Sequence, residues 1–125
     1  IGGKSMGGRI ASMVAAQGDK ELNKLIKGVV CLGYPFHPIG KPEKLRIEHL
    51  KDIQAPVFIA QGTRDKLGSY EEVNNYDLAK KIDFLWLDDG DHDFKPRVKS
   101  GYNYQTYLEQ VINKIAKSTK TIENN

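Results

Sequence analysis

Cysteine is nearly absent from this chain. Its 125 residues include one, Cys31, so no disulfide can form within the chain. Cys31 lies in an apolar run, and a lone buried thiol is typical of a reducing compartment. We therefore expect a cytoplasmic protein in which Cys31 is a small buried hydrophobic residue.

Long apolar runs and a strong net charge are lacking as well. No apolar stretch approaches the ~20 residues of a membrane-spanning helix, so no membrane partner is expected. The formal net charge is only +3. The lysines are spread over residues 19–27, 41–51 and 114–120, which is typical of a solvated surface. We therefore expect no nucleic-acid partner either.

Metal-ligating residues are sparse. His92 stands between Asp91 and Asp93, and alternate residues on a loop can chelate, but no second His or Cys lies nearby. Zinc sites draw His or Cys ligands from several positions. We therefore expect no metal, and no other cofactor.

Three short, continuous apolar runs occupy residues Val29–Leu32, 57–60 and 84–87. Such runs are typical of strands buried on both faces, as in a parallel sheet covered by helices. Segments with helical spacing flank them; these are residues 8–17, 20–27, 43–51, 70–81 and 101–117. The alternation predicts an α/β fold with three adjacent parallel strands, mostly buried and flanked by helices. The polar tail after Ser118 is expected to fray.

Residues 3–7 read Gly-Lys-Ser-Met-Gly, which fits the G-x-S-x-G nucleophile elbow. In that turn a strand passes sharply into a helix, and a side chain at either Gly3 or Gly7 would collide with a neighbouring element. Ser5 is then the predicted nucleophile. The backbone N–H of Met6 is the predicted oxyanion donor, at a helix N-terminus that favours negative charge.

The same residues allow another interpretation. Gly3, Lys4 and Ser5 could end a phosphate-binding loop, G-x-x-x-x-G-K-[ST], whose first glycine would precede Ile1. Gly7 stands where the elbow requires it, and later loops offer the other two members of a triad. Both features favour the elbow over nucleotide binding.

Asp65 and His92 each follow an apolar run directly, at the strand ends where parallel sheets carry functional groups. Alone, Asp65 could be a surface acid or a helix cap, and His92 an exposed loop residue. Together with Ser5 they stand in the chain order of the α/β-hydrolase triad. His92 is then the general base and Asp65 the acid that orients it. We expect all three at one edge of the sheet, with Asp65 closer to His92 than Asp88 is.

Two neighbouring acids and the remaining histidines have weaker claims. Asp91 and Asp93 could replace Asp65, but neighbours in sequence rarely fold back onto the same ring. The loop at residues 33–38 is rigid and lies above the predicted sheet; its Tyr34, Phe36 and His37 are expected to line a substrate pocket. His49 lies among charged residues of a predicted helix and is expected at the surface.

Four motifs in order resemble one group of α/β-hydrolases; they are residues 2–9, 33–38, 62–65 and 91–96. They are similar to the predicted-hydrolase branch related to dienelactone hydrolases, which includes testis-expressed and histone-acetyltransferase-complex-associated hydrolase-like proteins. The resemblance extends from residue 1 to about residue 117. It implies the fold and a triad of Ser5, Asp65 and His92, but no particular substrate. Lys66 and Leu67 depart from the Pro-Phe pair that similar proteins often carry.

Residues 1–125 are accordingly expected to be a partial domain, the C-terminal half of an α/β-hydrolase fold, starting at the nucleophile elbow. A full domain has further strands and a second oxyanion donor before the elbow, and losing one donor costs about 100- to 1000-fold in rate. We expect a serine hydrolase of small-molecule esters or related acyl substrates, impaired in the chain as it stands. The alternative is a non-catalytic hydrolase-like module for protein interactions.

Without a strand before Ser5, the run Val29–Leu32 becomes the edge of the sheet. It has no proline or inward charge to prevent pairing with another chain. We expect the chain to associate through this edge with itself or with a copy of the missing half. The simplest closed arrangement is a two-fold dimer in which two such edges pair antiparallel.

Overall fold

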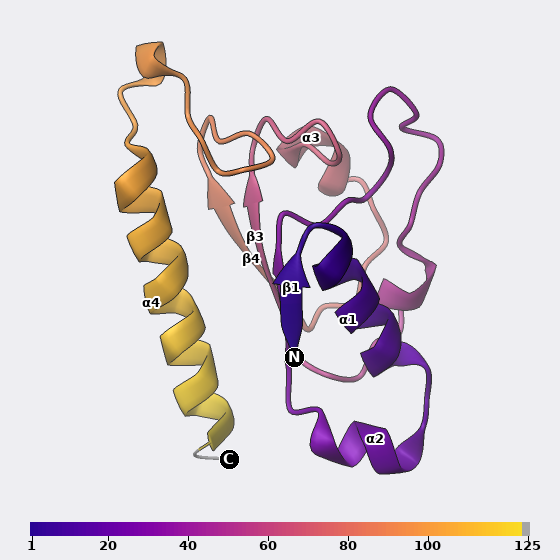
Figure 1. Ribbon diagram of the computed structural model, residues 1–125. Coiled ribbons are helices and arrows are strands. Elements are labelled where there is room, and N and C mark those ends of the chain that lie inside the picture. Colours follow the sequence, from indigo (N-terminus) through magenta and orange to yellow (C-terminus); the bar gives the residue numbers. More distant parts are fainter. Residues whose placement is uncertain (124–125) are drawn as a thin grey trace.

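A single parallel sheet organises the chain in the computed structural model, which describes residues 1–123 (Figure 1). Its four strands lie side by side in chain order: β1 (Gly2–Lys4), β2 (Val29–Leu32), β3 (Val57–Gly62) and β4 (Ile82–Leu87). Every neighbouring pair is parallel, so the predicted order and pairing of the last three strands are confirmed. Residues 124–125, which the predicted domain included, lie outside the described residues.

Helices cover both faces of this sheet, as the alternation of elements predicted. The four α-helices are α1 (Met6–Ala16), α2 (Lys20–Leu25), α3 (Tyr70–Val73) and α4 (Tyr104–Glu123), and short 3₁₀ turns occupy η1 (Glu48–Leu50) and η2 (Val98–Ser100). Figure 1 shows α1 and α4 on opposite sides of the sheet. None of the helices within residues 1–123 is both long and apolar enough to cross a membrane.

The two layers of core follow the alternation of side chains along the strands. On the α1 side, Cys31 and Ile59 pack with Ala11. On the α4 side, Phe58 packs with Val111. Strand β3 is buried at all six positions because it has a strand on either side and helices on both faces.

Strand β4 is less buried than predicted. Its ends, Ile82 and Leu87, are buried, whereas residues 84–86 are only half-buried. The reason is its place at one edge of the sheet, with a strand neighbour on one side. The exposed Asp83 forms an ion pair with Lys114 of α4, with 3.1 Å between the charged atoms.

Strand β1 is an element that the sequence analysis missed. Gly2, Gly3 and Lys4 pair with residues 30–32 of β2, and the Ser5 N–H continues the ladder to the Leu32 carbonyl at 2.8 Å. The expectation that no strand precedes Ser5 is therefore wrong, and so is the expectation that Val29–Leu32 is an open edge. Because β1 already covers Val29–Leu32, the reason given for pairing two copies through that strand no longer holds. Self-association of the chain by any other surface stays a prediction.

Two predicted helices are shorter than their apolar spacing suggested. Of residues 43–51, only η1 is helical, because the Arg46 N–H donates to the Phe36 carbonyl and the Arg46 carbonyl accepts from the Tyr34 hydroxyl. Of residues 70–81, only α3 is helical. There the Asn75 side chain donates to the Glu71 carbonyl and closes the helix, a competition with the backbone that asparagine favours.

Helix ends were predicted with mixed success. Ser69 is the N-cap of α3, as predicted. Gly18 follows α1 with a φ of 85°, the left-handed conformation typical of a helix stop. Helix α4 instead continues past Ser118 to Glu123, so the prediction of a frayed tail there is wrong within the described residues.

Glycine lets α1 approach the sheet closely at Gly3 and Gly8, whereas Gly7, the other glycine of the motif, is not needed for this contact. A β-carbon on Gly3 would lie 2.5 Å from the Gly7 carbonyl carbon, so the steric requirement predicted for Gly3 is confirmed. A β-carbon on Gly8 would lie 2.7 Å from the Gly3 carbonyl oxygen and 3.1 Å from the Cα of Cys31. A β-carbon on Gly7 would meet nothing within 4 Å, so the collision predicted there is wrong.

This difference predicts opposite outcomes for two adjacent substitutions. Gly8→Ala forces α1 away from backbone atoms and should lower the free energy of unfolding by about 1–3 kcal/mol. Gly7→Ala places a methyl group in open space inside a helix and should be neutral or stabilising by up to about 1 kcal/mol. Urea denaturation of both variants measures the contrast. Equal destabilisation of the two would contradict the proposed close approach at Gly8.

Candidate active site

Ser5 sits at the turn between β1 and α1 in a strained conformation. Its φ of 51° and ψ of −119° lie in a region that residues other than glycine rarely adopt. A serine at a helix N-cap usually accepts from a backbone N–H of the first turn, but Ser5 makes no such bond. Its hydroxyl is thus directed elsewhere, and the first-turn N–H groups of α1 have no intrahelical partner.

His92 meets that hydroxyl from a tight turn after β4. Its Nε2 lies 2.9 Å from the Ser5 Oγ. Asp91 closes the turn, because its Oδ1 accepts from the N–H groups of Asp93 and Lys95 at 2.8 and 2.9 Å. Phe94 has a φ of 69° and is buried in the core on the α4 side, which anchors the turn to the sheet.

Asp65, which follows the end of β3, is the residue that bonds to the other nitrogen of the His92 ring. Its side chain has no solvent exposure, and its Oδ2 accepts from His92 Nδ1–H at 2.8 Å. Its Oδ1 accepts from the Leu67 N–H at 2.8 Å. The imidazole is therefore held between a buried carboxylate and a half-buried hydroxyl.

The predicted placement of Ser5, Asp65 and His92 at one edge of the sheet is confirmed, with Asp65 as the carboxylate that bonds His92. They come from the carboxyl ends of β1, β3 and β4, where a parallel sheet brings its loops together. Their catalytic roles stay a prediction at this point.

The environment of His92 raises its affinity for a proton. The hydrogen bond to Asp65 raises the pKa of His92, burial lowers it, and the charges of Asp65 and Asp93 raise it further. The Lys4 ammonium opposes this, and the net result is a pKa above the ordinary value. A more basic imidazole is better suited to take a proton from a neighbouring hydroxyl.

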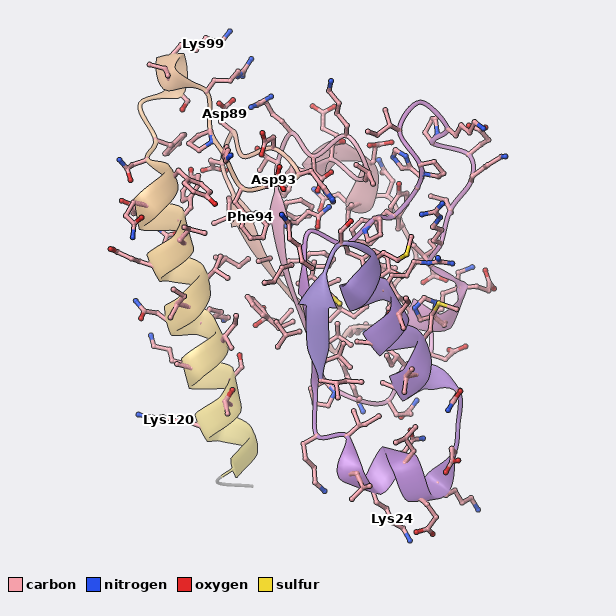
Figure 2. All side chains as sticks on the ribbon, viewed as in Figure 1. Lys24, Asp89, Asp93, Phe94, Lys99 and Lys120 are labelled. Carbon is pink, nitrogen blue, oxygen red and sulfur yellow. The ribbon has the colours of Figure 1, made fainter. Side chains whose placement is uncertain are left out.

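An ion pair joins the two ends of the site at the surface. The Nζ of Lys4, the residue before Ser5, lies 2.8 Å from Oδ1 of Asp93, the residue after His92. Figure 2 shows Asp93 on the loop after β4, beside the end of β1, with Phe94 nearer α4. Both charged groups are exposed, so the pair orients the loop more than it stabilises the fold.

A second charged cluster holds the base of the His92 loop. The Asp89 carboxylate accepts from the backbone N–H of Arg97 at 2.8 Å, and it pairs with the guanidinium groups of Arg97 and Arg64. The hydrogen bond with Arg97 keeps the pKa of Asp89 well below its ordinary range. Because Arg64 precedes Asp65, this cluster fixes the loops of the acid and the base to each other.

The predicted pocket residues are placed differently. Tyr34 and Phe36 have no solvent exposure and His37 has 3%, so none of them faces an open pocket. The loop that carries them folds beneath the Asp65 loop, because the His37 N–H donates to the Leu67 carbonyl. These side chains therefore support the acid loop from below.

The hydrogen-bond partners of His37 favour its charged form. Its Nδ1 lies 2.8 Å from the Pro38 carbonyl and its Nε2 lies 2.9 Å from a Glu72 carboxylate oxygen, and both partners only accept. Burial alone lowers the pKa of His37, but these two hydrogen bonds raise it above the ordinary value. Burial would raise the pKa of Glu72, yet bonds from Ser69 and His37 leave it lowered.

His49 is half-buried rather than at the surface as predicted. Its Nε2 lies 2.8 Å from the Ser12 Oγ and 3.3 Å from the Tyr34 hydroxyl. Ser12 and Tyr34 donate their own protons to backbone carbonyls, so His49 donates to both hydroxyls. Burial, and then the charge of Arg9, lowers the pKa of His49.

Gln61 was not among the predicted site residues, yet this fully buried amide near the end of β3 donates to Asp65 Oδ2 at 3.1 Å. Its signal was visible, because a polar residue directly follows an apolar run four positions before the predicted acid.

Two other kinds of site find little support. Strand β1 passes into α1 at the single residue Ser5, and Lys4 is engaged with Asp93, so the turn lacks the long glycine-rich cradle of a phosphate-binding loop. Among the side chains that the structure describes, no group of three from His, Cys, Asp or Glu is placed to hold a metal ion.

A cleft of about 620 Å³ lies at the opposite end of the sheet from Ser5. Its walls come from the starts of β2 and β3 and from the last turns of α4, and include Val29, Val57 and Lys117. It therefore belongs to a different part of the surface from the triad.

Comparison with known proteins points to one family. The sequence profile described as "Alpha/beta hydrolase domain" matches residues 1–120. Among solved structures, the esterase domain of a Rhodothermus marinus protein matches with a TM-score of 0.52 and 15% identity, over 75% of this chain and 52% of that one. An alpha-beta serine hydrolase homologue from Coxiella burnetii matches with a TM-score of 0.55 and 18% identity, over 87% of this chain and 47% of that one.

At these identities the structural likeness shows the fold alone, which is the α/β-hydrolase fold with a four-stranded parallel sheet. This chain spans about half the length of the solved structures it matches. The fold class predicted from the sequence is therefore confirmed, with one more strand than predicted.

The ion pair beneath the acid loop makes a prediction about stability and pH. Glu72→Gln removes the charge but keeps a side chain that can serve in the capping box with Ser69. Because the Glu72 side chain is 33% exposed and partly screened, the loss should be about 1 kcal/mol in unfolding free energy. It should be greatest between about pH 4.5 and about pH 6.5, the ordinary pKa values of the two groups.

The pH range follows from the directions in which the pKa values of His37 and Glu72 are shifted. The contribution of His37, whose pKa is raised, is lost as pH rises through its folded pKa. The contribution of Glu72, whose pKa is lowered, is lost as pH falls through its folded pKa. Denaturant unfolding across this range measures the difference, with Glu71→Gln at the neighbouring exposed position as the control. A difference independent of pH would rule out the ion pair.

Proposed function

The chain belongs to the α/β-hydrolase domain family, and on that premise we propose that it is a serine hydrolase of esters or related acyl substrates. The observation that carries the proposal is the continuous line of hydrogen bonds from Ser5 Oγ to His92 Nε2, and from His92 Nδ1 to the buried Asp65, at 2.9 and 2.8 Å. Nucleophile, base and orienting acid are thereby within bonding distance before a substrate arrives.

In the proposed first step, Ser5 Oγ attacks the carbonyl carbon of the ester while His92 Nε2 takes the hydroxyl proton. The positive charge that develops on the imidazole is stabilised by Asp65, to which Nδ1–H donates. The tetrahedral intermediate then collapses, the bond to the leaving alcohol breaks, and His92 returns the proton to that alcohol. An acyl group remains on Ser5.

The developing oxyanion is expected to lie at the start of α1. The Met6 N–H follows the nucleophile directly and belongs to the first turn, whose N–H groups have no intrahelical partner. In the second half of the reaction, a water molecule gives a proton to His92 and attacks the acyl carbon. The bond between that carbon and Ser5 Oγ then breaks, His92 returns the proton to Ser5 Oγ, and the acid is released.

The finer assignments rest on the sequence motifs. We propose that the chain belongs to the branch related to dienelactone hydrolases and to the testis-expressed hydrolase-like proteins, with a small-molecule ester as substrate. The exposed Met6, 61% accessible beside the nucleophile, offers an apolar surface for the acyl group. The buried, unpaired Cys31 supports a cytoplasmic location.

Substitution of the nucleophile tests the proposal. In the protein at its full natural length, Ser5→Ala should abolish labelling by a fluorophosphonate probe and cut ester turnover by several orders of magnitude. Ser12→Ala is the matched control, because Ser12 also contacts a histidine, but it is fully buried and its histidine, His49, contacts the Tyr34 hydroxyl. It should keep the labelling. Absence of labelling in the folded wild-type protein would favour the non-catalytic interaction module instead.

The pH dependence offers an independent test. The raised pKa of His92 means that its neutral form, the base, accumulates only above about pH 6.5. The acid limb of kcat/KM should therefore have its midpoint above this value. Asp65→Asn removes the largest cause of the shift, so it should move the midpoint to lower pH and reduce kcat by roughly 10⁴-fold. An unchanged midpoint in a folded Asp65→Asn variant would remove Asp65 from the proposed triad.

A further inference from the structure

Gln61 is a polar side chain at the most protected place in the sheet. It lies near the end of β3, the strand buried at every position, and has no solvent exposure. We propose that Gln61 is a positioning residue, whose amide fixes the Asp65 carboxylate and through it the orientation of the His92 ring. The inference extends the proposed hydrolase function and rests on it for its kinetic consequences.

The orientation of the Gln61 amide is determined by its neighbours. Its Oε1 accepts from the Tyr34 N–H at 2.8 Å. Its Nε2 faces three oxygens, on Asp65 Oδ2 at 3.1 Å, the Tyr34 carbonyl at 3.1 Å and the Gly68 carbonyl at 3.0 Å. The reversed amide would place a donor against the Tyr34 N–H and an acceptor against three oxygens. Only one orientation is therefore compatible with this site.

These bonds hold the carboxylate from both of its oxygens. The Leu67 N–H donates to Oδ1 and the Gln61 amide to Oδ2, so the plane of the Asp65 carboxylate is set without any contribution from His92. The remaining bond at Oδ2 comes from His92 Nδ1–H at 2.8 Å. That bond requires the proton on Nδ1, which leaves the lone pair of Nε2 facing Ser5.

Gln61 also forms hydrogen bonds with two loops, the one after β2 and the one that carries Asp65. Tyr34 belongs to the loop after β2, and Gly68 ends the loop that carries Asp65. A purely structural cross-link would affect stability alone, whereas a positioning residue must also affect the protonation of His92 and the rate of the chemical step. The two roles are therefore separable by measurement.

Two substitutions at Gln61 and one control separate them in the protein at its full natural length. Gln61→Met keeps the length of the side chain but removes its hydrogen bonds. Gln61→Glu can replace the amide only while its carboxyl is protonated, because the ionised form repels Asp65. Gln54→Met alters an exposed glutamine whose side-chain amide donates to the Asp52 carbonyl, far from Asp65 in the chain, and serves as the control.

The first readout is the pKa of His92 by NMR in protein with labelled histidines. The chain has three histidines, and a His92→Gln variant assigns the signal. In Gln61→Met the pKa of His92 should fall toward its ordinary value, because the Asp65 carboxylate is free to turn away. In Gln54→Met it should match the wild type. This readout does not require catalysis.

The second readout is ester hydrolysis. Gln61→Met should lose roughly 10- to 100-fold in kcat with little change in KM, as expected for a misplaced catalytic group. Gln61→Glu should retain more activity than Gln61→Met at low pH and lose that advantage as pH rises and the introduced carboxyl group ionises.

The outcomes are distinct. A folded Gln61→Met variant with the wild-type His92 pKa and wild-type kcat would overturn the inference. If Gln61→Met does not fold, a Gln61→Glu variant whose activity follows the wild-type pH profile would overturn it equally. If the wild-type protein shows no Ser5-dependent labelling, the hydrolase function fails, while the His92 pKa still decides whether Gln61 positions the acid.

Discussion

Asp65 carries an acidic side chain into a part of the protein that solvent does not reach. Burial of such a group without partners costs several kcal/mol, so hydrogen-bond donors have to converge on it. They come from three segments: the Leu67 N–H of its own loop, the Gln61 amide of β3 and the His92 ring from beyond β4. Satisfying the hydrogen bonds of this one carboxylate therefore draws together the loops that place His92 beside Ser5.

The sheet makes that convergence possible because its backbones approach one another without side chains between them. A side chain at Gly62 would collide with the backbone of Gly90 and Asp91, and one at Gly33 would press on His92, whose carbonyl oxygen would lie 3.0 Å away. The loop after β4 thus lies directly on the ends of β2 and β3. The alignment of Ser5, His92 and Asp65 follows from this close backbone packing as much as from the three side chains themselves.

The sequence predicted those features that a local pattern of residues indicates. Asp65 and His92 directly follow apolar runs, and parallel pairing then brings them together. Strand β1 could not be predicted in this way, because Gly2–Lys4 has no apolar side chain. It is identified as a strand by its pairing with β2. Residues 43–51 have helical spacing, but the backbone N–H and carbonyl of Arg46 form hydrogen bonds with the loop after β2 instead of within a helix. Gln61 could have been suspected from its polarity, yet its partners depend on how separate loops fold.

The distance along the chain between Ser5 and His92 has a consequence for folding. They stand 87 residues apart, with three strand pairings between them. Contacts of such high sequence separation form late, since the entropy of closing long loops must be overcome first. A partly folded chain, or one still emerging during synthesis, therefore holds Ser5 as an ordinary alcohol. The hydrogen bond between Ser5 Oγ and His92 Nε2 forms only when the whole sheet has assembled, so this contact reports on completed folding.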